Sequence, residues 1–252
     1  MINWQPLLDE FQQWHDAGLI LPFWWRDDDA VAPTAQLETL INISSELNIP
    51  CHLAVIPKHA TQALAKRIST TDQIIPIIHG WAHENHAPAG QKKSEFGMTR
   101  SIEDCATDAI LSLQQLQDLF GEQLKPIFVP PWNRINPELG QHLVAIGYDV
   151  LSTYGPRKSR FATPGLTQIN THLDPIAWRA DRSLIPPRTV ISQTVELMQS
   201  RRLGDIDNTE PLGFLTHHLI HDAALWTFVK QFLTIMRKGP ISAFRYSDDP
   251  LE

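Results

Sequence analysis

The chain has 252 residues and a formal net charge of −7, from 21 Lys and Arg against 28 Asp and Glu. Hydrophobic residues make up 42% and charged residues 19%, a balance that is typical of a globular domain and excludes a disordered tail or a coiled coil. The acidic balance argues against a nucleic-acid-binding surface, which needs clustered Lys and Arg. The 11 His and 8 Trp direct attention to a metal or proton-transfer site and to sugar-stacking surfaces.

Regularly spaced apolar residues predict helices and strands that alternate along the chain. We expect a helix near 4–18, a strand at 19–25, a helix at 34–47, strands at 53–56 and 74–78 with a helix at 61–68 between them, a helix at 101–120, a strand at 127–129, a helix from 136, strands at 149–153 and 168–173, a helix at 187–202, a strand at 212–216, a helix at 222–237 and a strand at 243–246.

This alternation is typical of an α/β fold with a parallel sheet, and so many units predict a closed or nearly closed TIM-like barrel. We expect one domain, 1–252, with an N-terminal helix at 1–18 and the barrel at 19–246. The irregular stretch 87–100 includes Lys92 and Lys93 and is a candidate mobile lid.

Cysteine use and the N-terminus predict a cytoplasmic protein. Cys51 and Cys105 make no disulfide framework and are expected to be small buried core residues. The N-terminus lacks the basic and apolar regions of a signal peptide. Apolar stretches such as Leu19–Trp25 are far shorter than the roughly 20 residues of a membrane span. The sequence predicts no particular oligomeric state.

Polar clusters follow the predicted strands, where an α/β barrel holds its active site. Asp27, Asp28 and Asp29 come after the first strand, and their mutual repulsion needs a cation or a shared proton to relieve it, although a solvated loop is the simpler interpretation. His79 and His83 follow the third strand, and their spacing allows them to share a metal on one side of a helical turn.

Three further clusters complete the pattern. Pro131 and its neighbours can aim the Trp132 amide N–H at an oxyanion, or form an ordinary rigid loop. Trp178 is either a substrate wall or a core residue. His217 and His218 point to opposite sides if their strand continues, so one of them can face the barrel mouth. Two His and one carboxylate make a three-ligand zinc site with a position left for water.

The ordered clusters resemble the polysaccharide deacetylases, carbohydrate esterase family 4, which share the nodulation-B homology domain. The resemblance runs from about Leu19 to Tyr246. It implies a distorted (β/α)7-type barrel and removal of N-acetyl groups from amino sugars by an enzyme with Zn²⁺ or another divalent metal. It implies His79 and His83 as metal ligands and His217 as the catalytic acid, with His218 as the alternative.

The acidic motif aligns in two registers. One makes Asp28 the base and Asp29 the metal ligand, and the other makes Asp27 the base and Asp28 the ligand. The first is preferred because it aligns the small residue Ala30 with the glycine of the family motif. Pro131, Trp132, Asn133 and Trp178 are the expected substrate contacts.

Two departures from the family pattern concern residues that orient the catalytic pair. The arginine that orients the base is Val129 here, and Arg26 or Arg134 are candidate replacements. The acid before the motif tryptophan is Ala177, and Asp174 or His172 are candidate replacements.

The leading hypothesis is a zinc-dependent deacetylase in which a metal-bound water attacks the amide of an N-acetylated sugar or oligosaccharide precursor. Two alternatives keep the scaffold. One is a metal-dependent hydrolase of a non-sugar C–N bond, and the other is a catalytically silent glycan-binding protein. The departures from the family pattern are the reason to weigh both.

Overall fold

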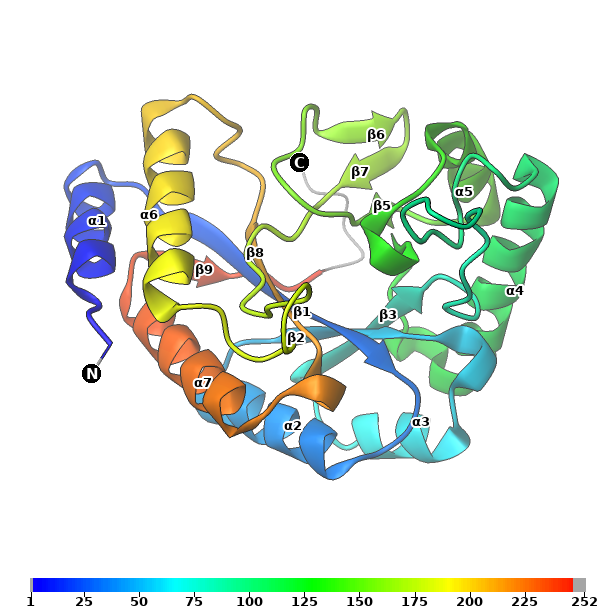
Figure 1. Ribbon diagram of the computed structural model, residues 1–252, viewed down its shortest axis with the longest axis horizontal. Coiled ribbons are helices and arrows are strands. Elements are labelled where there is room, and N and C mark those ends of the chain that lie inside the picture. The colour runs from blue at the N-terminus through cyan, green and yellow to red at the C-terminus, as the bar shows by residue number, and fades with distance from the viewer. Residues whose placement is uncertain (1, 247–252) are drawn as a thin grey trace.

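The computed structural model describes residues 2–246 and contains a nine-stranded sheet wrapped by helices (Figure 1). The strands are β1 (Leu21–Ala30), β2 (Cys51–Val55), β3 (Ile74–His79), β4 (Ile127–Val129), β5 (Val150–Leu151), β6 (Phe161–Thr163), β7 (Leu166–Gln168), β8 (Leu212–Thr216) and β9 (Ile241–Ala243). The helices are α1 (Gln5–Asp16), α2 (Ala35–Leu47), α3 (Gln62–Ile68), α4 (Ile102–Phe120), α5 (Gly140–Ile146), α6 (Pro187–Leu203) and α7 (Ala223–Lys238), and 3₁₀ turns occupy Pro57–His59, Gly121–Gln123, Pro131–Asn133, Pro137–Leu139 and His218–Ile220.

The sheet is mostly parallel and curls back on itself. Its strand order is β6-β7-β5-β4-β3-β2-β1-β8, with β9 paired to β1, and only the β6–β7 pair is antiparallel. After β7, Leu173 bridges Phe214 of β8, and the Leu215 N–H donates to the Leu173 carbonyl at 2.8 Å. The two ends of the sheet therefore meet, which confirms the predicted distorted (β/α)7-type barrel.

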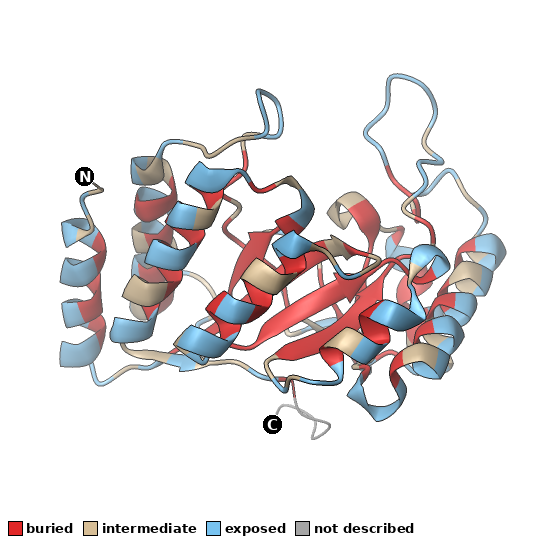
Figure 2. Ribbon diagram, turned by 90° about the horizontal axis from the view of Figure 1, so that it is seen from below, coloured by how far each residue is buried: buried red, intermediate tan, exposed pale blue. Residues whose placement is uncertain are grey.

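Side-chain alternation along the strands divides the core into two parts. In β1, Phe23 and Trp25 face the helices, while Trp24 faces the barrel interior together with Ile75 and Ile77 of β3. In Figure 2 the helices turn their buried faces to the sheet and their exposed faces outward. This alternation points Asp27 and Asp28, near the end of β1, to opposite sides of the sheet.

The helix boundaries follow capping chemistry in the sequence. Thr34, Thr61, Ser101 and Asp222 each accept a hydrogen bond from a backbone N–H in the first turn of α2, α3, α4 and α7, at 2.7 to 3.2 Å. Each of these caps also orients the chain as it leaves the carboxyl end of a strand or the loop beyond it. No helix among residues 2–246 is long and apolar enough to cross a membrane.

The cysteines are buried as predicted, but most of the tryptophans are structural. Cys51 and Cys105 are fully buried and unpaired. Trp14, Trp24 and Trp25 are also buried, and each donates its indole N–H to an internal oxygen. The high Trp count therefore reflects core packing more than sugar stacking.

The antiparallel hairpin of β6 and β7 was not predicted. Pro164 and Gly165 form its two-residue turn, and Gly165 has a φ of 87°. A Pro-Gly pair between short strand-forming segments is a turn signal in the sequence. The segment predicted as a strand at 168–173 begins two residues earlier, at Leu166, and continues beyond Gln168 only as isolated bridges.

A buried histidine gives the fold a pH dependence. Burial lowers the pKa of His52 to about 3, outweighing its contact with the Trp25 carbonyl. Its Nε2 accepts the Tyr246 N–H at 3.2 Å, which only the neutral ring can do. Because the folded pKa lies below the unfolded value of 6.5, the stability contributed by neutral His52 is complete above pH 6.5 and is lost as the pH falls toward 3.

We expect His52→Asn to flatten the fall of unfolding free energy between pH 6.5 and pH 4 by up to about 1.4 kcal/mol per pH unit. Denaturant titrations at several pH values measure this slope. Trp24→Phe is the matched control, because Trp24 packs edge-on against the His52 ring and its loss destabilises the same cluster without removing a titrating group. Equal slopes in the wild type and His52→Asn would contradict the assignment.

Candidate active site

A β-bulge brings two neighbouring acids to the same side of β1. Asp27 pairs with Leu53 and Ala30 with Val55, so three steps along β1 are opposed by two along β2. Asp29 carries the deviation, with a φ of 77°. In a regular strand Asp28 and Asp29 would point to opposite faces, whereas the extra residue lets both side chains reach the barrel mouth.

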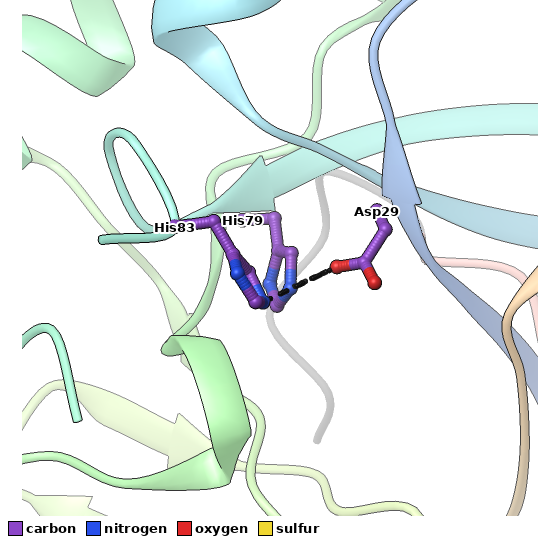
Figure 3. A group of neighbouring side chains, drawn as sticks. All are labelled: Asp29, His79 and His83. Carbon is purple, nitrogen blue, oxygen red and sulfur yellow. Dashed lines mark hydrogen bonds and ion pairs between the residues drawn. The ribbon is translucent and has the colours of Figure 1, made fainter. Parts of the chain in front are cut away.

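Asp29, His79 and His83 form a cluster with the donor set of a divalent metal site (Figure 3). Their ligand atoms all lie within 4.8 Å of one another. The Asp29 Oδ1 lies 3.1 Å from the His79 Nε2 and 3.4 Å from the His83 Nε2. Two imidazoles and one carboxylate suit zinc and related metals and leave a coordination position free.

The backbone fixes the orientation of the His79 ring. Its Nδ1 lies 3.0 Å from the Val129 carbonyl oxygen and must donate a proton to it, so in the neutral ring Nε2 carries the lone pair that a metal would bind. Burial lowers the pKa of His79, but the charge of Asp28 and the hydrogen bond that the protonated ring donates from Nε2 to Asp29 outweigh it, and the net pKa is raised. A bound cation would offset the negative charge of Asp29 and Asp28 and would bind the lone pairs of the two imidazoles.

The loop between the two histidines is not the helical turn that the sequence predicted. It is an irregular turn in which Gly80 and His83 have φ values of 55° and 57°. A Cβ at Gly80 would lie 2.4 Å from both the Glu95 carboxylate and the Pro131 ring, so only glycine fits. A positive φ at each end of the loop, rather than helical spacing, turns both rings toward Asp29.

Glu95, which was not among the predicted site residues, holds this loop in place. Its buried carboxylate accepts the backbone N–H groups of Trp81 at 3.2 Å, Ala82 at 2.7 Å and Glu84 at 3.4 Å. Glu95 lies in the stretch predicted as a mobile lid, and Phe96 beside it is also fully buried. An acid next to an aromatic residue in an otherwise polar loop is the only signal in the sequence for this anchor.

Arg26 orients Asp28 from inside the barrel. Its Nη2 donates to the Asp28 Oδ2 at 2.9 Å and its Nε lies 2.9 Å from the Oδ1. The same guanidinium donates to the Asn133 Oδ1 and to the Ser152 hydroxyl, each at 2.7 Å. Both side chains of the pair are almost completely buried. Of the two arginines considered as replacements for the family arginine, Arg26 is the one in contact with Asp28.

Asp27 and His218 lie behind the site. The Asp27 carboxylate accepts from the Thr216 hydroxyl at 2.6 Å and lies 2.5 Å from the His218 Nδ1. His218 is fully buried, and neither residue lines the cavity. The register with Asp27 as base and His218 as an alternative acid therefore has no geometric support, because strand alternation turns Asp27 toward the helices.

His217 reaches the site from the end of β8, the strand next to β1. It lines the same cavity as Asp28 and Asp29, and its ring packs edge-on against Trp178 with centroids 4.6 Å apart. The Trp178 indole donates to Asp174 at 2.7 Å. Burial raises the pKa of Asp174 against the opposing effect of His217. His172, the other candidate partner, binds Glu210 outside the cavity.

The cavity that joins these groups has a volume of about 960 Å³. Of the expected substrate contacts, Trp132, Asn133 and Trp178 line it, and Trp178 is 43% exposed. Pro131 does not line it, because Pro131 is buried against Gly80. Tyr154 also lines it, although no sequence pattern indicated this residue, and burial together with Asp174 raises its pKa to about 12.

Comparisons with known proteins identify the fold. No family model matches the chain, and no curated protein matches its sequence. Similar solved structures include a family 4 carbohydrate esterase from Streptomyces lividans in complex with acetate, with 12% identity over 90% of this chain and 93% of that one and a TM-score of 0.59.

Two further structures agree. A family 4 carbohydrate esterase from Streptococcus mutans is 10% identical, covers 91% of this chain and 87% of its own and has a TM-score of 0.58. A mutant of the peptidoglycan deacetylase PdaC from Bacillus subtilis is 11% identical, covers 88% and 86% and has a TM-score of 0.55. The family 4 esterase fold that the sequence motifs predicted is thus confirmed, and at these identities the likeness concerns the fold.

We expect Arg26→Met to lower the free energy of unfolding by about 3–5 kcal/mol, because it leaves the buried Asp28 carboxylate without its partner. The same substitution made in an Asp28→Asn background is the control. There it should cost much less, because no buried charge remains to be compensated. Denaturant titration of the four proteins measures the coupling. An equal cost in both backgrounds would show that Arg26 acts by packing alone.

We expect Glu95→Gln to weaken Zn²⁺ binding about 10- to 100-fold, as the loss of a group that orients metal ligands does in other sites. Calorimetric titration with Zn²⁺ measures the affinity. Glu84→Gln is the matched control, because Glu84 lies in the same loop but points outward to Lys58 at 2.7 Å. The anchoring role of Glu95 is wrong if both variants bind Zn²⁺ as the wild type does.

Proposed function

We propose that the protein is a metal-dependent hydrolase that removes an N-acetyl group from an amino sugar or a glycan precursor. The observation that carries the proposal is the shared cavity, which is lined by the cluster Asp29, His79 and His83 and also by Asp28 and His217. One cavity thus brings together a candidate metal-ligand set, a further carboxylate and a further imidazole.

Asp29, His79 and His83 would hold the metal, with Zn²⁺ as the expected ion. A divalent metal at this position would polarise the amide carbonyl and make water a better nucleophile. Side chains of the protein would supply the proton transfers and the stabilisation of the oxyanion. We assign each role from the position of the residue around the cavity.

Asp28 is assigned as the general base. Its carboxylate lines the cavity beside the ligand cluster, in reach of a water molecule on the metal side. Arg26 holds that carboxylate in one orientation and offsets its charge. A base that is fixed in this way needs no rearrangement when it takes up a proton.

His217 is assigned as the general acid, which protonates the leaving amine. Its Nδ1 is buried without a hydrogen-bond partner among the described residues, and its ring position is held by Trp178. Asp174, bonded to the Trp178 indole, fixes that tryptophan and places a carboxyl group near the imidazole.

The loop after β4 is suited to stabilise the oxyanion. Trp132 and Asn133 adopt positive φ values of 58° and 56°, a costly conformation for two adjacent non-glycine residues. Asn133 is held there by its bond to Arg26. The backbone N–H of Trp132, a residue that lines the cavity, is the proposed donor to the developing negative oxygen. Trp132 and Trp178 offer flat apolar surfaces on which a sugar ring can stack.

The test separates metal binding from proton transfer. We expect Asp29→Ala and His79→Ala to lose stoichiometric Zn²⁺, measured by elemental analysis after dialysis. We expect Asp28→Asn and His217→Asn to retain Zn²⁺ while kcat for acetate release falls about 10²- to 10⁴-fold. Lys66→Gln, an exposed change in α3, is the control for handling and folding.

Acetate release from N-acetylated sugars is measured beside ammonia release from cyclic and acyclic amides. Acetate release that depends on Zn²⁺ and on Asp28 supports the proposal. Ammonia release with the same dependence would assign the site to a non-sugar C–N bond. Full Zn²⁺ retention by both ligand variants would show that the metal site is misassigned.

A further inference from the structure

Four cationic side chains surround the active-site cavity of a chain whose net charge is negative. Lys93, Arg134, Arg179 and Arg182 line it, although the whole sequence carries a formal charge of −7. None of the four makes an ion pair with a carboxylate among residues 2–246. Cations that are left unpaired at a cavity mouth focus a positive potential into it.

The four cations come from two opposite walls. Lys93 and Arg134 belong to the loops that flank the β3 and β4 ends, and the Arg134 Nη1 donates to the Lys93 carbonyl at 2.6 Å. Arg179 and Arg182 belong to the segment between β7 and α6, which reaches the mouth from the β8 side. A ligand in the cavity therefore has cationic side chains within reach on both flanks.

Each cationic pair accompanies an aromatic residue of the cavity wall. The Lys93 Nζ lies 5.9 Å from the centroid of the Trp132 ring, and Arg179 follows Trp178 directly in the chain. The Arg182 backbone has a φ of 61°, and its N–H is bonded to the Ala177 carbonyl at 3.2 Å, so this turn is fixed by its backbone. The cations thus flank the surfaces on which a sugar ring would stack.

The carboxylates of the cavity do not cancel this charge. Asp28 is paired with Arg26, and burial raises the pKa of Asp174, which disfavours its charged form. Asp29 belongs to the metal-ligand cluster, where a divalent cation would more than offset it. The charge left for a ligand at the mouth is therefore positive.

We propose that the cavity selects substrates in which the N-acetylated sugar carries an anionic group, a phosphate or a carboxylate, bound by Arg179 and Arg182 on one wall and by Lys93 and Arg134 on the other. The proposal rests on the function proposed above for the same site. The proposal is based on the four cationic side chains that line the cavity, because a neutral glycan chain has no anionic group to pair with them.

Binding of N-acetylglucosamine 1-phosphate is compared with that of methyl N-acetylglucosaminide by calorimetry, with the metal-free and the Zn²⁺-loaded protein. We expect the phosphate to bind about tenfold more tightly in both forms, because two or more charge-assisted contacts form at partly exposed positions. Raising NaCl from 50 to 500 mM should erase that preference, because added salt screens exposed charges.

The double variant Arg179→Gln/Arg182→Gln should lose most of the preference. The matched control is Arg188→Gln/Arg237→Gln, which removes the same charge from exposed positions on α6 and α7 outside the cavity. The same binding measurement with N-acetylmuramic acid, whose anionic group is a carboxylate, shows whether the cavity prefers a phosphate or a carboxylate. A preference for only one of the two anions narrows the substrate class and supports the proposal.

Equal affinity for the charged and neutral sugars would overturn the proposal, as would an equal loss of preference in the two double variants. These outcomes differ from a failure of the proposed function. If the phosphate binds preferentially but no N-acetyl sugar releases acetate with Zn²⁺, the deacetylase assignment fails and the anion site stands. If neutral sugars are deacetylated as efficiently as charged ones, the deacetylase assignment stands and the anion site fails.

Discussion

The buried guanidinium of Arg26 is the interaction on which the active site depends. It lies inside the barrel and contacts Asp28 of its own strand, Asn133 of the loop after β4 and Ser152 just after β5. A buried charge is costly unless it is fully paired, so the three partners are held to one geometry. The Asp28 carboxylate, the strained loop after β4 and the chain just after β5 are thereby fixed relative to one another by a single side chain.

The candidate metal-ligand cluster depends on backbone conformations that cost free energy, which other contacts offset. Asp29 and His83 both adopt positive φ values, and Gly80 turns the chain where no side chain fits. The buried Glu95 carboxylate, the Val129 carbonyl and the packing of Pro131 stabilise these conformations. The positions of Asp29, His79 and His83 thus depend on contacts made by residues in the neighbouring loops.

Two adjacent histidines of different character follow β8. His218 is buried against Asp27 and ties the 3₁₀ turn to β1. His217, one residue earlier, lines the cavity beside Trp178. Strand alternation separates Asp27 from Asp28 in the same way, so on β1 a residue in a buried contact and a residue of the cavity are also neighbours in the chain.

The barrel, its element order and the residue types of the candidate site could be predicted from the sequence, because hydrophobic periodicity and helix caps are local signals. The sequence also predicted that Asp29, His79 and His83 share a site, because parallel strands place their carboxyl ends at one edge. The sides to which the three acids point are visible only in the folded chain, since a one-residue bulge in β1 has no signature in the sequence. The same holds for the contacts of Arg26 with Asn133 and Ser152, because these partners are distant in the chain and meet only when the barrel closes.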